Sequence, residues 1–129
     1  MIWYIAAGSA VGGVSRYLLG GLVHRFAGTT FPVGTLVINI TGSLLLGAIL
    51  RYAVATPILT VELRALLTIG FCGGYTTFSS FSYETAALME DGEWSRAALY
   101  VLASVTLSVL GTFAGFALAR EALILRGRL

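Results

Sequence analysis

The sequence predicts an all-α integral membrane protein with four transmembrane helices, the third of them broken near its centre. The chain has 129 residues, of which 57% are hydrophobic and 11% are charged, and its mean hydropathy is +0.90. A soluble domain carries about a quarter charged residues. Four nearly charge-free stretches each approach or exceed the roughly 20 residues that cross a bilayer core. This composition excludes a nucleic-acid-binding protein, a secreted disulfide scaffold and an enzyme with a soluble catalytic domain.

The first two spans are bounded by polar and basic residues. Span 1 is predicted over residues 2–23 as a retained helix, because no basic segment precedes it and three more apolar segments follow. We expect His24 and Arg25 to end this span. Pro32 suits the first turn of the next helix. Span 2 is therefore predicted over residues 33–50, ending at the next arginine.

The third span contains the signal for a break. It is predicted over residues 62–89, with the break near residues 73–78, because Gly73 and Gly74 lie at its centre and a run of hydroxyl residues follows them. Non-helical backbone is tolerated at membrane depth only where protein covers it or where it faces a cavity. After a short acidic turn, span 4 is predicted over residues 95–119.

Arginines gather at the end of the spans that also holds the N-terminus. Five lie on that side and three on the other side or within span 1, so the bias favours a cytoplasmic N-terminus, although such small loops also permit insertion in both orientations. The loops leave no room for another domain, and residues 1–129 are expected to form one membrane domain. The five arginines are Arg51, Arg64, Arg120, Arg126 and Arg128, and the three are Arg16, Arg25 and Arg96.

Two spans carry small or polar residues at every fourth position. This spacing places them on one face of each helix. Two such faces predict a lined path through the membrane, although hydroxyl groups also bond within their own helix and small residues also mark close packing. The positions are Thr35, Asn39, Ser43 and Gly47 in span 2, and Tyr100, Ser104, Ser108 and Thr112 in span 4.

Three side chains near the predicted break are candidates for contact with a small anion. The Asn39 amide has two N–H donors, and it is either an anion ligand or a clasp between two helices. Phe78 and Phe81 are three residues apart, and they either fill the core or present positively polarised ring edges to an anion. The broken backbone also offers carbonyl oxygens to a hard cation such as Na+.

The charged residues within the spans each have two interpretations. Arg16 either extends to the far interface of the membrane or attracts anions from a vestibule. Glu84 either marks the wet end of the second half-helix or pairs with an arginine. The sequence contains no nucleophile with a nearby base, no metal-ligand cluster and no phosphate-binding loop, so we expect no enzymatic activity.

An oligomer is expected, because four short helices do not enclose a sizeable polar cavity by themselves. Pairs of glycines four residues apart permit helices to approach closely, either within one chain or between chains. These pairs are Gly8 and Gly12, Gly70 and Gly74, and Gly111 and Gly115.

The sequence resembles the Fluc/CrcB family of fluoride channels over essentially its whole length. The resemblance rests on Gly12, Gly13 and Arg16 in span 1, on residues 34–39 in span 2 and on residues 70–85 in span 3. The last of these, GFCGGYTTFSSFSYET, is long and specific. The resemblance implies an antiparallel, dual-topology homodimer with two pores, which exports cytoplasmic fluoride passively across a bacterial inner membrane and contacts membrane lipid.

The resemblance also implies roles for individual residues. Asn39, Phe78 and Phe81 match the pore residues of the family. A structural Na+ is implied on the dimer axis, held by the main-chain carbonyl groups of Gly73 and Thr76 from each chain. The residues that match the polar track of the family are Tyr100, Ser104, Ser108 and Thr112.

Two other functions remain as alternatives. A small proton-coupled multidrug exporter has a similar size, but it needs a membrane-embedded carboxylate in its first span, and span 1 has none. A membrane assembly subunit without transport activity predicts a stable heteromeric partner and tolerance of alanine at Asn39.

Overall fold

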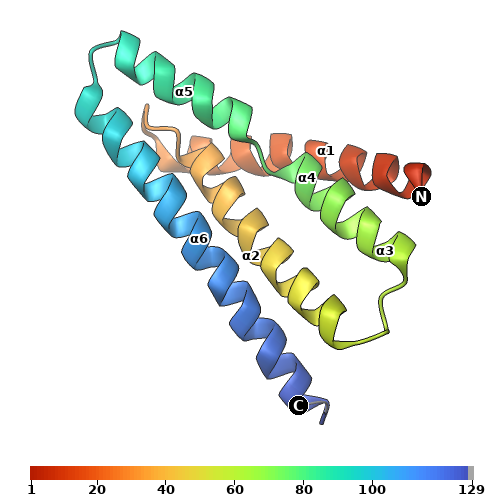
Figure 1. Cartoon of the computed structure of the whole chain (residues 1–129). Helices are drawn as coiled ribbons and strands as arrows, with labels where there is room; N and C mark the ends of the chain where they lie inside the picture. The colour runs from red at the N-terminus through yellow and green to blue at the C-terminus, as the bar shows by residue number, and fades with distance from the viewer. Residues whose placement is uncertain (128–129) are drawn as a thin grey trace.

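The computed structural model describes residues 1–127 of the chain, and the regular structure of these residues is helical (Figure 1). Arg128, which contributed to the arginine count above, lies outside the described residues. Three helices are long: α1 (Ile2–Ala27), α2 (Val33–Ala55) and α6 (Trp94–Leu125). The chain between α2 and α6 forms α3 (Val61–Ala65), the π-helical segment η1 (Leu66–Cys72), α4 (Gly73–Tyr75) and α5 (Phe78–Glu90).

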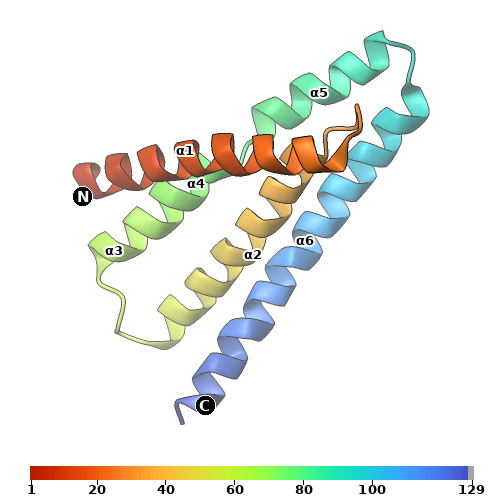
Figure 2. The same cartoon turned by 180° about the vertical axis from the view of Figure 1, so that it is seen from behind.

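The helices α2 and α6 form the most extensive pair in the molecule. They run in the same direction and lie side by side in both views (Figures 1 and 2). Helix α1 crosses α2 obliquely (Figure 2) and packs against η1 and α4, whereas α5 packs against α6. Within residues 1–127, α2 and α6 are long and apolar enough to cross a membrane.

The long helices extend past the predicted ends of their spans. Helix α1 continues through His24 and Arg25 and ends at Ala27, because Gly28 adopts the left-handed conformation with φ 58° and ψ 29°. Helix α2 continues past Arg51 to Ala55, and α6 reaches Leu125 instead of ending at residue 119. The helices continue past the basic residues that were expected to bound the spans, because arginine is a good helix former. Charge limits the apolar layer but does not end a helix.

The helical path stops between α4 and α5. Thr76 (φ −82°, ψ 158°) and Thr77 (φ −152°, ψ 113°) are extended, and α5 begins at Phe78. Gly73 and Gly74 are helical, so the interruption follows the glycines and does not coincide with them. The Thr77 hydroxyl accepts a hydrogen bond from the Ser80 N–H at 3.1 Å, which caps the new helix.

Glycines allow the helices of this one chain to touch through their backbones. A Cβ atom on Gly74 would lie 2.6 Å from the carbonyl oxygen of Ser9, and one on Gly47 would lie 2.6 Å from that of Thr112. The glycines of the three predicted pairs all meet backbone atoms of a neighbouring helix within the chain. Intrachain packing therefore accounts for these pairs.

Candidate functional site

The side chain of Asn39 binds the backbone where the helical path stops. Its Nδ2 donates to the Thr77 carbonyl oxygen at 3.0 Å, and its Oδ1 accepts the Thr77 N–H at 2.8 Å. In a continuous α-helix that N–H would donate to the carbonyl of Gly73. The structure thus contains the clasp that the sequence offered as one interpretation of Asn39. A primary amide has two N–H bonds, so one further donor remains beyond this clasp.

A cavity of about 320 Å³ lies beside this clasp, between α2, α5 and α6. Ser104 is buried there, and its hydroxyl is the buried side-chain polar atom without a hydrogen-bond partner in residues 1–127. An unsatisfied buried hydroxyl costs about 1–3 kcal/mol, so this position favours a polar ligand. The predicted site residues that line the cavity are Asn39, Ser43, Thr76, Phe78, Phe81, Ser104 and Ser108.

The remaining members of the two polar tracks lie outside this cavity. Gly47 and Thr112 meet where α2 contacts α6, and the Thr112 hydroxyl donates within its own helix to the Ser108 carbonyl at 3.2 Å. Thr35 and Tyr100 belong to a separate cluster around Glu84. The tracks that look continuous in the sequence are therefore divided into three parts.

Glu84 of α5 is held by two hydroxyl groups. The Thr35 hydroxyl donates to its Oε1 at 2.7 Å, and the Tyr100 hydroxyl donates to its Oε2 at 2.6 Å. Tyr100 is fully buried and Glu84 is half-buried. The arginine partner that was one of the two interpretations of Glu84 is not found within residues 1–127, where the ion pair is between Arg96 and Glu93. Neutral hydroxyl donors hold this carboxylate in place of an opposite charge.

A row of aromatic rings connects the cavity with the Glu84 cluster. The ring centroids of Phe78 and Phe81 are 5.4 Å apart, those of Phe81 and Tyr100 are 5.2 Å apart, and those of Phe31 and Tyr100 are 5.5 Å apart. Phe81 is half-buried, whereas Phe78 is 78% exposed. Core packing within the chain therefore does not account for Phe78.

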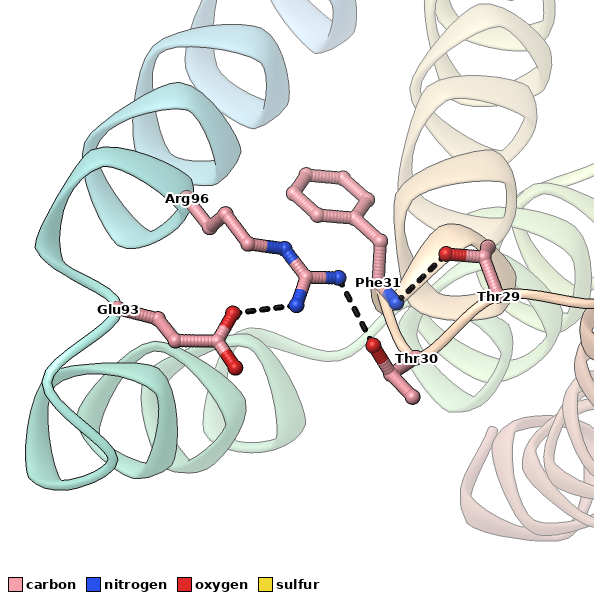
Figure 3. A network of polar contacts seen from close by, with 5 residues as sticks. All are labelled: Thr29, Thr30, Phe31, Glu93 and Arg96. Carbon is pink, nitrogen blue, oxygen red and sulfur yellow. Dashed lines mark hydrogen bonds and ion pairs between the residues drawn. The ribbon is translucent and has the colours of Figure 1, made fainter.

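Sequence reasoning missed Phe31, which a network of polar contacts holds in place (Figure 3). Arg96 of α6 donates to Glu93 and to the Thr30 hydroxyl, the latter at 3.0 Å, and its guanidinium carbon lies 5.8 Å from the centroid of the Phe31 ring. The Phe31 N–H donates to the Thr29 hydroxyl at 3.2 Å. This network joins the α1–α2 loop to the α5–α6 turn (Figure 3).

Arg16 lies at a second, larger cavity of about 660 Å³ between α1, α2 and α5. Its Nη1 donates to the Thr76 carbonyl oxygen at 3.3 Å. The guanidinium is thus directed to the interruption between α4 and α5, and not to the far interface that the first interpretation requires. Glu84 and His24 line the same cavity, whereas the sequence marked His24 only as the end of span 1.

The two carbonyl groups predicted to bind Na+ have different surroundings. Gly73 is exposed, and its carbonyl does not receive the Thr77 N–H, which Asn39 accepts. The Thr76 carbonyl accepts a hydrogen bond from Arg16, whose positive charge opposes a cation there. Within residues 1–127, no group of histidine, cysteine or acidic side chains is arranged to hold a metal ion. A cation at this position would therefore rely on carbonyl oxygens, the ligands that suit a hard ion.

The apolar helices and the hydroxyl-lined cavity between them define a helical membrane protein that keeps polar groups within its spans. A family profile described as "CrcB-like protein, Camphor Resistance (CrcB)" matches residues 3–116. Because this match covers most of the sequence, the chain belongs to the CrcB family.

Relatives with high identity share one description, "Fluoride-specific ion channel FluC". The chain is 55% identical over 117 residues to the protein of that description from Geobacter sulfurreducens, a match that covers 91% of this chain and 94% of the relative. It is 50% identical to that of Geobacter metallireducens with the same coverage. It is 47% identical to that of Coxiella burnetii over 118 residues, which cover 91% of this chain and 95% of the relative.

Replacing Asn39 with alanine is expected to lower the free energy of unfolding by about 2–4 kcal/mol, because the buried N–H and C=O of Thr77 lose their partner together. Denaturant unfolding of the protein in detergent, followed by circular dichroism, measures this. The matched control is Ser43→Ala on the same helix face, since the main-chain oxygen of Ser43, and not its hydroxyl, accepts the Thr112 hydrogen bond. Equal stability of the two variants would contradict the clasp.

Proposed function

We propose that this chain forms a fluoride-selective passive ion channel that exports cytoplasmic fluoride across a bacterial inner membrane. The descriptions of its relatives support this function and are those of ion channels, so the chain is not an enzyme. The observation that carries the proposal is the cavity between α2, α5 and α6, where the buried Ser104 hydroxyl has no partner within residues 1–127. A small anion that accepts hydrogen bonds satisfies this group.

The chemistry of the cavity suits fluoride. A small, strongly hydrated anion loses much solvation energy when it enters a medium of low dielectric constant, so a narrow route must replace water with several donors. The second N–H of Asn39 and the Ser104 and Ser108 hydroxyls are such donors. The ring edges of Phe78 and Phe81 carry partial positive charge and add weaker contacts. Contacts of this strength replace hydration and still let the ion leave.

The route we propose follows the three parts of the polar tracks in order. Arg16 raises the concentration of anions in the larger cavity, which serves as the vestibule. Fluoride then passes the Thr35 and Tyr100 hydroxyls, each of which has one O–H donor and must turn it from Glu84 to the ion. It crosses the cavity between α2, α5 and α6, and leaves along α6. The residues of the proposed pore are Thr35, Asn39, Ser43, Phe78, Phe81, Tyr100, Ser104, Ser108 and Thr112.

We further propose that the channel is an antiparallel homodimer with two pores. One chain leaves the Phe78 ring 78% exposed beside the cavity, so the cavity lacks part of its wall. A second copy of the chain supplies that wall to each pore. Opposite orientations of the two copies run against the arginine bias, but the bias is small and such short loops permit insertion in both orientations.

The Na+ proposal concerns the same interface. Gly73 is exposed and its carbonyl is free of the Thr77 N–H, which supports a role in binding. One chain offers two carbonyls, Gly73 and Thr76, and a hard cation takes more ligands than two, so the site requires both copies. A bound Na+ supplies positive charge that joins carbonyl oxygens of the two chains, and the ion is structural and is not transported.

Reconstituted liposomes provide the test of the function. Liposomes loaded with fluoride are expected to lose it through the protein, whereas liposomes loaded with chloride keep their contents. An ion-selective electrode for each anion measures the efflux. Absence of fluoride efflux from a well-folded dimer would overturn the channel and favour the membrane assembly subunit.

Replacing either Phe78 or Phe81 with isoleucine is expected to reduce fluoride efflux to the level of protein-free liposomes, because isoleucine has no polarised ring edge. Size-exclusion chromatography checks that the dimer is intact. The control is Phe113→Ile, the same change at an exposed ring of α6 that does not line the cavity. Unchanged efflux in the Phe78 and Phe81 variants would remove these rings from the pore.

An experimental structure of the dimer is expected to contain a density peak between the paired carbonyl groups of Gly73 and Thr76. Purification without Na+ should remove the peak and lower the melting temperature of the dimer. A dimer with no peak and no response to Na+ would contradict the cation site while leaving the fluoride channel untouched.

A further inference from the structure

An apolar groove lies at the end of the molecule opposite the Arg96 network. It has a volume of about 340 Å³ and forms where the C-terminal parts of α2 and α6 meet the segment that leads into η1. These elements come together at the lower end of the molecule in both views (Figures 1 and 2). The groove includes Ile49 and Tyr52 of α2, and Leu118 and Ala122 of α6. Leu59, from the loop after α2, and Leu67 of η1 complete it.

A cation is fixed at one wall of this groove. The Nη1 of Arg126 donates to the Tyr52 hydroxyl at 2.5 Å, and the guanidinium carbon lies 5.8 Å from the centroid of the Tyr52 ring. Because Tyr52 also lines the groove, the guanidinium lies next to this apolar groove. Arginine has five N–H donors and Tyr52 takes one of them, so this exposed guanidinium keeps donors for a ligand.

Arginines outnumber acidic residues among the sequence neighbours of the groove residues. Arg51 precedes Tyr52 in α2, and Arg120 lies between groove residues of α6, whereas Glu121 is the acidic residue of that stretch. Arg51 and Arg120 are exposed, and within residues 1–127 neither takes part in the ion pair found. Glu62 and Arg64, which lie between Leu59 and Leu67, balance one another, so these sequence neighbours of the groove carry a surplus of two arginines.

We propose that this groove binds an anionic phospholipid, with an acyl chain along the apolar walls and the phosphate at Arg126. The apolar groove and the fixed guanidinium together match a molecule that has both a hydrocarbon chain and a negative headgroup. A free phosphate ion makes no use of the groove. A zwitterionic lipid gains less from the surplus of arginine, because its headgroup carries its own positive charge. The site is independent of the proposed pore, since none of its residues lines either pore cavity.

Native mass spectrometry of the detergent-solubilised, full-length protein tests this proposal with phosphatidylglycerol as the probe and phosphatidylcholine as the comparison. The wild-type protein is expected to bind phosphatidylglycerol more tightly. Arg126→Gln should weaken that binding about fivefold, because one arginine near an anionic lipid contributes about that factor. Arg25→Gln is the matched control, since it removes the same charge from an exposed arginine near the C-terminal end of α1, which does not line this groove.

Two further arms separate the lipid from its headgroup alone. Ala122→Phe fills the groove and should weaken phosphatidylglycerol binding while leaving Arg126 in place. The second arm uses the wild-type protein, so its result does not depend on whether a variant folds. A short-chain phosphatidylglycerol should bind more weakly than the dioleoyl lipid. Equal binding of the short-chain and dioleoyl lipids would overturn the proposal in favour of a simple anion site. Displacement of phosphatidylglycerol by inorganic phosphate would do the same. Equal effects of Arg126→Gln and Arg25→Gln would overturn it in favour of general surface charge.

Discussion

The structure depends on how one interrupted stretch of backbone is satisfied inside an apolar molecule. A bilayer core offers no water to a free N–H or C=O group, so each must find a partner in the protein. Asn39 provides both partners for Thr77 with a single amide. Because α5 starts directly after Thr77, this clasp sets where α5 begins and, through it, where Phe78, Phe81 and Glu84 lie. It also diverts the N–H that the Gly73 carbonyl would otherwise receive.

Around that clasp, side chains of the same type have different surroundings. The Ser104 hydroxyl is buried without a partner within residues 1–127, the Thr112 hydroxyl bonds to its own helix, and the Thr35 hydroxyl holds a carboxylate. All three come from positions with the same four-residue spacing. Spacing decides which face of a helix a residue occupies, whereas the neighbouring helix decides whether its hydroxyl is available to a ligand.

This distinction explains how much of the molecule could be predicted from its sequence. Hydropathy was sufficient for the helical membrane class, and the position of Asn39 among apolar residues was sufficient to mark it as important. The ends of the helices could not be placed, because Arg25 and Arg51 limit the apolar layer without ending the helix. The partners of Glu84 and the role of Arg96 were also missed. These contacts join residues that are far apart in the chain, and local patterns carry no information about them.

The exposed ring of Phe78 has a consequence for how the protein is made. The ring lies beside a cavity that one chain leaves partly unwalled. If a second copy completes that wall, as we propose, a newly inserted single chain has no complete pore. Membranes that receive such chains one at a time during synthesis then do not leak ions before assembly. On this proposal, the incompleteness of the single chain protects the cell during biogenesis.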